Sequence, residues 1–464
     1  MTTEKTTDDI QTEPLTTTTT TTTATAPETK GRDASETTGA GPRRDRFGRV
    51  LRRADFEIMA PAGSREAMMA AVRSGADSVY FGVGELNMRA HSTGDFTRAD
   101  LPALARLLHE NGVKAYLTVN TVLYDEDMEE MRTLVAEAKA AGIDAVIVSD
   151  PAAMTAAHEA GIPAHLSTQL SIGNIESLKF YAPYADVAVL ARELTLEQVA
   201  RIHEAIETTP VVGPSGRPVR IELFCHGALC MAVSGRCFMS LHTRGKSANR
   251  GACLQNCRRS YVLRDTDRDI ELAVDDQYIM SPKDLKTIDF MDRLVDAGVR
   301  VFKIEGRARS PEYVLETVAC YREALEAVLD GTYGDENRHA WDERLGRVFN
   351  RGFWDGWYLG RRVGELSGGY GSQATEKKVF VGTCIDYFAR AKAGWFRIQA
   401  QHLEVGDKVL VTGPTTGAVT GTVTEMREEE KTVVKAEKGM CVTFPFDVKI
   451  RTNDKLYKLV ERQK

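Results

Sequence analysis

The sequence has no apolar run approaching the roughly 20 residues that a membrane-spanning helix needs. Its amino terminus also lacks the apolar core of a secretory signal peptide. We therefore expect a cytoplasmic protein that does not enter a membrane. The net charge of −6 excludes a uniformly basic, nucleic-acid-coating protein, although residues 373–464 carry 16 Lys and Arg against 12 Asp and Glu.

Several catalytic signatures are also missing. The chain contains neither the HExxH motif of zinc peptidases nor the GxSxG motif of serine hydrolases. Its eight cysteines include no CxxC pair, the arrangement that zinc ribbons favour. In a reducing compartment, cysteines indicate metal or redox chemistry rather than a disulfide framework.

The first 50 residues have almost no large apolar side chains and include eight consecutive threonines, Thr16 to Thr23. A segment of this composition cannot bury enough surface to offset its conformational entropy. We therefore expect residues 1–50 to form a disordered Thr-rich tail, with the folded part beginning near residue 55.

From Phe56 onward, short apolar runs alternate with amphipathic helical patterns. Eight such runs occur, at 57–61, 78–82, 114–119, 145–150, 164–169, 187–193, 220–226 and 300–307. Strand and helix alternating eight times is the signature of an α/β fold with a parallel (β/α)8, TIM-like barrel. The alternative is an open doubly wound sheet built from the same units. We assign residues 55–370 to the barrel domain.

Three of the predicted strands carry polar residues on one face. In 220–226, Glu222, Phe224 and His226 alternate with apolar neighbours, and in 164–169 the alternating residues are His165, Ser167 and Gln169. In 300–307 they are Lys303, Glu305 and Arg307. Helices cover the outside of such a barrel, so we expect these polar faces to point inward. The carboxyl ends of the strands, where active sites of barrel enzymes lie, then become the candidate site.

Between the seventh and eighth strands the chain spends residues 227–296, far more than a crossover requires. Four cysteines fall in this insertion, at Cys230, Cys237, Cys253 and Cys257, so they would lie over the barrel mouth. Four thiolates suit a 4Fe-4S cluster or a tetrahedral zinc ion, and unligated cysteines are a third reading. Uneven spacing favours the larger cluster. Cys225, on the opposite strand face, is predicted to be a core cysteine.

Residues 375–464 show short strands separated by Gly, Asn and Asp, which predicts a small carboxyl-terminal β-barrel domain. Its modest positive charge would suit RNA, and an ordinary solvated surface explains it equally well.

The chain also resembles a known family. The run that carries the resemblance holds Glu222, Phe224, Gly227, Cys230 and Cys237, and it is supported by the segments MAPAG (59–63), GADSVYFG (75–82), HLSTQ (165–169), ARELTLEQ (191–198) and KIEGR (303–307). These segments are similar to those of the U-32 peptidase-like, or collagenase-like, family over residues 56–370.

The resemblance implies an oxygen-independent hydroxylase that carries a 4Fe-4S cluster on Cys230, Cys237, Cys253 and Cys257. It further implies a tRNA-modifying enzyme, one that 5-hydroxylates the wobble uridine with prephenate as co-substrate, and partners that deliver electrons or the cluster. Two alternatives remain open, a peptidase of the collagenase type and a 23S rRNA cytidine hydroxylase of the same family. A noncatalytic RNA-binding module with structural zinc is a third.

The strand pattern and the family resemblance together indicate roles for individual residues. The candidates for proton transfer are Glu222, His226 and Glu305. Cations suit a small anionic co-substrate, and the expected substrate-binding residues are Arg89, His165, Gln169, Arg192, Lys303 and Arg307. The stretch from Ser240 to Leu263 is basic and free of acidic residues. Its candidates for RNA binding are Arg244, Lys246, Arg250, Arg258 and Arg259.

Overall fold

A computed structural model describes residues 42–91, 95–265, 270–272, 278–361, 363–369 and 371–462. The predicted tail therefore lies outside the described residues as far as residue 41. Residues 42–50 already pack on the folded part: Arg43 pairs with Asp296 at 2.7 Å, and Arg49 pairs with Glu207 at 2.7 Å. Within the described ranges, no helix has the length and apolarity needed to cross a membrane.

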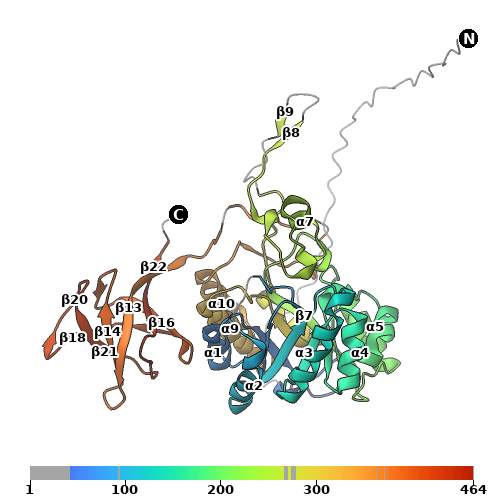
Figure 1. Cartoon of the computed structure of the whole chain (residues 1–464), viewed down its shortest axis with the longest axis horizontal. Helices are drawn as coiled ribbons and strands as arrows, with labels where there is room; N and C mark the ends of the chain where they lie inside the picture. Colours follow the sequence, from blue (N-terminus) through green and yellow to red (C-terminus); the bar gives the residue numbers. More distant parts are fainter. Residues whose placement is uncertain are drawn as a thin grey trace, which may run out of the picture. The chain divides into compact units, whose positions relative to one another are not determined.

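The predicted parallel barrel is confirmed (Figure 1). Its eight strands all coincide with predicted runs: β1 (Glu57–Pro61), β2 (Ser78–Phe81), β3 (Lys114–Val119), β4 (Ala145–Val148), β5 (Ala164–Leu166), β6 (Val187–Val189), β7 (Arg220–Gly227) and β11 (Val299–Ile304). Each strand pairs in parallel with the next, and β11 pairs with both β7 and β1. That double pairing closes the barrel and excludes the open doubly wound sheet.

Helices follow the strands as the pattern predicts. They are α1 (Arg65–Arg73), α2 (Leu101–Glu110), α3 (Met128–Ala140), α4 (Pro151–Ala160), α5 (Ile175–Tyr181), α6 (Leu196–Thr208), α8 (Met291–Asp296), α9 (Pro311–Asp330) and α10 (Asp335–Arg347). Local caps fix where some of them begin. For example, Asp150 accepts the backbone N–H of Ala152 at 2.9 Å and starts α4, which ends at Gly161 in a left-handed conformation.

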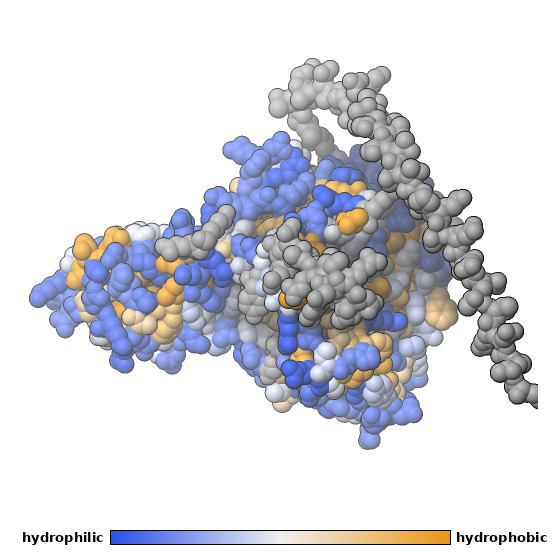
Figure 2. All heavy atoms as spheres, turned by 90° about the horizontal axis from the view of Figure 1, so that it is seen from above, coloured by the Kyte–Doolittle hydropathy of each residue, from blue (hydrophilic) through white to orange (hydrophobic). Residues whose placement is uncertain are grey.

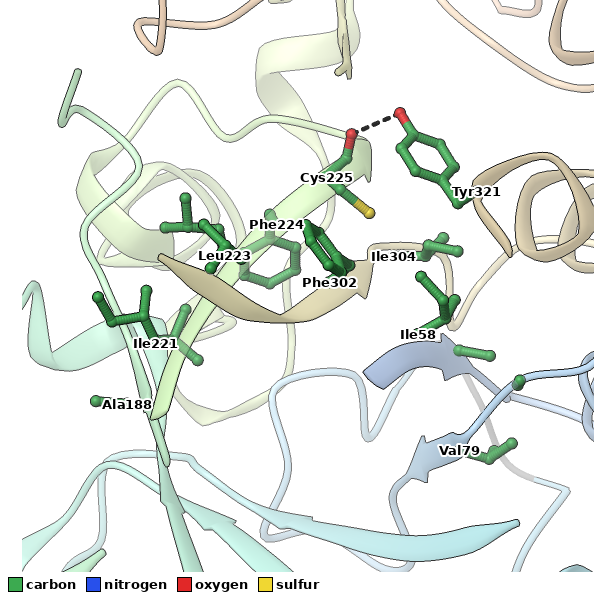
Figure 3. Packing of buried hydrophobic residues seen from close by; sticks show 14 of the residues in the cluster. Ile58, Val79, Ala188, Ile221, Leu223, Phe224, Cys225, Phe302, Ile304 and Tyr321 are labelled. Carbon is green, nitrogen blue, oxygen red and sulfur yellow. Dashed lines mark hydrogen bonds between the residues drawn. The ribbon is translucent and has the colours of Figure 1, made fainter. Parts of the chain in front are cut away.

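Strands β4 to β6 are shorter than the predicted runs, so several polar residues lie just beyond the strands rather than within them. Ser167 and Gln169 follow β5 at the start of a short helical turn, and Arg192 follows β6. The outer face of β7 is apolar as expected. Leu223 and Cys225 are fully buried, and Figure 3 shows the carbonyl oxygen of Cys225 accepting the Tyr321 hydroxyl, at 2.8 Å.

The insertion after β7 contains α7 (Met239–Arg244), the hairpin β8 (Leu263–Asp265) and β9 (Ile270–Leu272), and strand β10 (Asp284–Lys286). In Figure 1, α7 and the hairpin lie on the same side of the barrel. Strand β10 pairs antiparallel with the end of β7 and parallel with β12 (Phe353–Trp354), which extends the barrel sheet to ten strands. This extension was not predicted from the sequence.

The carboxyl-terminal region is antiparallel, with its own apolar core around Phe396 and Phe444. One sheet has the order β17 (Gly417–Thr422), β16 (Lys408–Gly413), β22 (Lys455–Glu461), β13 (Glu376–Phe388), β14 (Ala393–Ile398), β21 (Cys441–Pro445), β18 (Arg427–Glu428) and β19 (Lys431–Thr432). A second sheet pairs β15 (Leu403–Glu404) with β20 (Lys435–Ala436). The pairings thus give an eight-stranded and a two-stranded sheet where a small β-barrel was predicted.

Candidate functional site

A cavity of about 630 Å³ lies at the carboxyl ends of the barrel strands. Its floor includes Tyr80, Thr118, Phe224 and Lys303, and residues 228–258 of the insertion contribute much of the remaining lining. The lining is strongly cationic. Among the described residues it contains two carboxylates, Glu193 and Glu305, against eight cations: Arg89, Arg192, Arg236, Arg258, Lys303, Arg307, Arg309 and Arg351. A pocket of this charge favours anionic ligands.

Glu222 and Lys303 form a fully buried ion pair beneath this cavity. The Lys303 ammonium donates to Glu222 Oε1 at 2.7 Å, and His165 Nδ1 lies 3.6 Å from Glu222 Oε2. Burial alone would raise the pKa of Glu222, but Lys303 and His165 outweigh it and hold that pKa below its ordinary value. Lys303 reaches the cavity and Glu222 supports it from below, so the two predicted site residues act as a unit.

Glu305 is the second buried carboxylate of the site. Arg89 donates to Glu305 Oε1 at 3.0 Å, and the Tyr80 hydroxyl lies 3.3 Å from Oε2. Burial opposes ionisation, yet Arg89, Arg307 and Arg192 lower the pKa of Glu305 to about 2. Glu305 is therefore an anion at neutral pH, and a proton acceptor rather than a proton donor.

Two arginines present their guanidinium groups to the cavity in different ways. Arg307 donates to Asn87 Oδ1 at 3.0 Å and to Thr118 Oγ1 at 2.9 Å, and burial lowers its pKa to about 10. Arg192 stacks on the Phe224 ring, with its guanidinium carbon 3.7 Å from the ring centroid. The Nε of each guanidinium is buried without a hydrogen-bond partner in the described part of the chain. Both residues line the cavity, and guanidinium groups suit carboxylate ligands.

Glu222, Phe224 and His226 were predicted to share one face of β7. This prediction is wrong for His226. Residue pairing between β7 and β11 jumps from Lys303–Phe224 to Ile304–His226, so β7 has one extra residue there. His226 consequently packs outside the pocket among Tyr313, Tyr321 and Phe353, at ring distances of 5.4 to 5.8 Å. Burial lowers its pKa to about 3, with Lys286 and Arg309 adding to the shift. His226 is a neutral core residue rather than a candidate for proton transfer in the pocket.

His165 and Gln169, both expected to bind substrate, separate from one another. Gln169 lines the pocket and is hydrogen-bonded to Ser167. His165 lies deeper, next to Glu222, with its ring 4.5 Å from that of Tyr116, and it lines a different cavity at the other end of the barrel. Of the three alternating residues, Ser167 and Gln169, which follow β5, reach the pocket, whereas His165 within β5 does not.

All four predicted cysteine ligands line the pocket. Cys230 is exposed, and Cys237, Cys253 and Cys257 are partly exposed. Burial raises the pKa of the Cys257 thiol; Arg258 opposes the shift, while Cys230, Cys253 and Cys237 add to it, so the four thiols are close enough to interact. Across the described ranges, no three His, Cys, Asp or Glu side chains are grouped as ligands of a single metal ion.

Short polar contacts hold the cysteine loops together. The backbone N–H of Met239 donates to Cys237 Sγ at 3.4 Å, and Asn249 Oδ1 accepts the N–H of Cys237 at 3.2 Å. Ser240 Oγ accepts the N–H of Leu254 at 3.0 Å, which joins the loop of Cys253 to α7. The insertion is thus folded around its thiols, and one thiol already accepts a backbone N–H, as a thiolate ligand does.

The five predicted RNA-binding cations fall into two groups. Arg244, Lys246 and Arg259 are exposed. Arg250 instead pairs with Asp127 at 2.6 Å and ties the insertion to the start of α3. Arg258 donates to the carbonyl oxygens of Leu229 and Pro282 and to Ser281, and burial lowers its pKa. The first group is available to a partner, whereas Arg250 and Arg258 stabilise the insertion.

Among the polar pocket residues that were not predicted from the sequence are Tyr80, Thr118 and Asn120. Strand alternation could have found the first two, because Ser78 and Tyr80 share one face of β2 and Tyr116 and Thr118 share one face of β3. Asn120 follows β3 directly and donates to Ser167 at 3.3 Å. Its place at a strand end was the available signal.

Comparisons with known proteins agree with this architecture. The family described as peptidase family U32 matches residues 63–367. The chain is 56% identical over 409 residues to a collagenase of Porphyromonas gingivalis, covering 88% of this chain and 99% of that protein. It is 29% identical over 413 residues to tRNA hydroxylation protein P1 of Bacillus subtilis, covering 87% and 94%. To the 23S rRNA 5-hydroxycytidine C2501 synthase of Escherichia coli it is 34% identical over 322 residues, covering 67% and 46%. The chain belongs to peptidase family U32.

Proposed function

We propose that this protein is a tRNA-modifying enzyme that 5-hydroxylates the wobble uridine, using a small anionic co-substrate such as prephenate and a 4Fe-4S cluster. One observation carries the proposal: a cationic pocket at the barrel mouth is lined by four cysteines, and Cys257 lies close enough to interact with the other three. A pocket of eight cations and two carboxylates suits a dicarboxylate. Thiols beside such a pocket suit redox chemistry.

The four cysteines fit a cluster in number and chemistry. Cys230, Cys237, Cys253 and Cys257 would each bind one iron, which requires less crowding than four sulfurs around one ion. A cluster agrees with two observations on the described residues. Cys257 interacts electrostatically with the other three thiols, and the four thiols do not form a site for a single metal ion. When bound, the cluster would supply single-electron chemistry next to the pocket. Arg258, whose guanidinium is held beside Cys257, would offset part of the thiolate charge.

The pocket residues would bind the co-substrate and transfer protons. Arg192 and Arg307 offer guanidinium donors to the carboxylates of the co-substrate. Lys303 is the cation that reaches the cavity while paired to Glu222, so it can donate a proton at Nζ. Glu305, held ionised by Arg89, is placed to accept one. Insertion residues between 228 and 258 line the same pocket as these groups.

An exposed surface of the insertion fits RNA. The residues from Leu223 to Arg264 include no Asp or Glu, and Arg236, Arg244, Lys246 and Arg259 are exposed there. Phe238, 61% exposed, lines the pocket entrance and offers a ring for an unpaired base. Figure 2, seen from above the view of Figure 1, shows apolar residues in patches on a largely hydrophilic face.

The share of each relative's length that aligns with this chain favours tRNA over rRNA as the substrate. Alignment with the tRNA hydroxylation protein includes 94% of that relative, whereas alignment with the rRNA synthase includes only 46% of it. A shared length and domain content therefore points to the tRNA reaction. The rRNA reaction is the second choice within the same chemistry.

A peptidase is the competing function, and the 56% identity to a protein named collagenase favours it. The described pocket lining contains no histidine and no aspartate, so it has no Ser–His or Cys–His pair of the kind that activates a peptidase nucleophile. The geometry therefore supports the hydroxylase better.

The test uses a host from which the gene is deleted. We expect its tRNA to lose 5-hydroxyuridine by nucleoside mass spectrometry, the full chain to restore it, and Cys237→Ala to fail. Cys441→Ala is the matched control, because Cys441 lies in the carboxyl-terminal sheet. Anaerobically purified Cys237→Ala should also lose iron while the control retains it. Unchanged tRNA with loss of 5-hydroxycytidine from 23S rRNA would select the second choice, and gelatin cleavage unaffected by Cys237→Ala would select the peptidase.

A further inference from the structure

The interior of the barrel contains a row of buried ionisable residues where such barrels ordinarily pack aliphatic side chains. They come from four different strands and are at most 5% exposed: Glu57 on β1, His165 on β5, Glu222 on β7 and Lys303 on β11. Burying four ionisable groups is costly unless they serve a purpose. Only Lys303 of the four reaches the pocket at the barrel mouth.

The other end of this row opens on a second cavity. It has a volume of about 1210 Å³, lies at the amino-terminal ends of the strands, and is lined by Glu57, Tyr116, His165 and Arg220 among others. Lys114 and Arg220 contact Glu57 Oε2 at 3.1 and 3.4 Å. Burial raises the pKa of Glu57, but Lys114, then His165 and then Arg220 overcome that effect and lower it to about 2.

His165 lies where the two halves of the row meet. It faces Glu57 from β1, Tyr116 from β3 and both Glu222 and Arg220 from β7. Its Nδ1 is 3.6 Å from Glu222 Oε2, and neither atom has a hydrogen-bond partner in the described part of the chain. A small rotation of the ring would close that distance into a hydrogen bond. On the far side of Glu222, Oε1 already accepts the Lys303 ammonium at 2.7 Å.

We propose that His165 is a proton-relay residue, which takes up protons at the amino-terminal cavity and passes them through Glu222 to Lys303 in the reaction pocket. In one cycle Lys303 Nζ gives a proton to the reacting ligand, and Glu222 hands a proton from His165 Nδ1 to Nζ. His165, now without its Nδ1 proton, takes up a proton at Nε2 from the cavity at the amino-terminal face, and exchange of the ring proton from Nε2 to Nδ1 restores the starting tautomer. Each group returns to its starting charge, and no oxidant or reductant is consumed.

This route explains two features that the proposed function alone leaves open. The amino-terminal cavity gives the row of buried ionisable residues a second opening, so a proton can enter without crossing the reaction pocket. Glu57, held ionised by Lys114 and Arg220, keeps an anion beside the imidazole. His165 is therefore assigned to proton supply rather than to substrate binding.

The first test measures turnover and therefore rests on the proposed function. We expect His165→Gln to lower the rate of hydroxylation by roughly 100-fold, the lower end of what general acid–base groups contribute. Added imidazole should restore part of the rate in His165→Gly, because the amino-terminal cavity leads to the vacated position. His158→Gln, an exposed position on α4, is the matched control. A wild-type rate in His165→Gln would overturn the relay, as would a slow variant that imidazole fails to rescue.

The second test needs no activity. Histidine is labelled with ¹⁵N in the full chain, and His165 is assigned by the signal missing from His165→Gln. A relay requires both ring nitrogens to carry the proton part of the time, so their shifts should be averaged and their protons should exchange rapidly with water. A single fixed neutral tautomer from pH 5 to 9 would overturn the relay, even if hydroxylation is never observed. Absence of hydroxylation with averaged nitrogens would instead remove the proposed function and leave the relay standing.

Discussion

Replacing Lys303 with methionine tests whether the buried charge pair holds the site together. Methionine keeps an unbranched chain of similar length but leaves Glu222, which is fully buried, without its 2.7 Å partner. His165, 3.6 Å away, is too distant to replace it. Removing one partner of a buried ion pair costs about 3 to 5 kcal/mol, so we expect the free energy of unfolding to fall by that amount at pH 7.

The pH dependence should change sign in this variant. In the wild-type protein the pKa of Glu222 is lowered, so its contribution to stability is present above its ordinary pKa and is lost as pH falls. Without Lys303, burial dominates and raises the pKa of Glu222 above the unfolded value. The carboxyl then takes up a proton on folding, and the variant should regain stability relative to the wild type as pH falls from 7 toward 5.

Urea titrations at pH 5 and pH 7 measure both effects, and a double-mutant cycle isolates the pair. We expect Glu222→Gln combined with Lys303→Met to be more stable than Lys303→Met alone, because the uncompensated charge is gone. A loss below about 1 kcal/mol in Lys303→Met, or additive effects in the double variant, would refute a tightly coupled buried pair.

Four further variants test other parts of the site. Gly227→Ala should destabilise the fold by more than about 2 kcal/mol in a urea titration, because φ is +105° and a Cβ would lie 2.3 Å from the carbonyl oxygen of Glu305. His226→Phe should retain hydroxylation, since His226 is a neutral core residue; a 5-hydroxyuridine content as low as that of the gene deletion would contradict this placement. Arg244→Ala with Lys246→Ala should reduce the slope of log affinity for tRNA against log salt by about 2, whereas an unchanged slope would remove them from the interface. Arg250→Ala should leave that slope unchanged and lower the free energy of unfolding by roughly 1 to 3 kcal/mol.

The sequence predicts those features that depend on local periodicity. All eight barrel strands coincide with predicted runs, and the expected polar residues His165 and Lys303 are buried on β5 and β11. What it cannot predict depends on distant partners. Arg250 is an RNA-binding candidate by sequence, but Asp127, 123 residues earlier, pairs with it in the fold. Charge alone does not distinguish a cation that binds a ligand from one that is paired within the protein.

The bulge between β7 and β11 explains both the placement of His226 and the position of the cysteine insertion. Because β7 has one residue more than β11 after Phe224, Glu222 and Phe224 face the barrel interior while His226 turns toward Tyr321. The next residue, Gly227, takes a φ that other residues avoid, and its Cα lies close against the backbone of Glu305. Strand β10 then returns to pair with His226 and Gly227, so both ends of the cysteine-bearing segment are fixed at one strand end. The thiols are thereby held over the pocket by the same irregularity that removes the histidine from it.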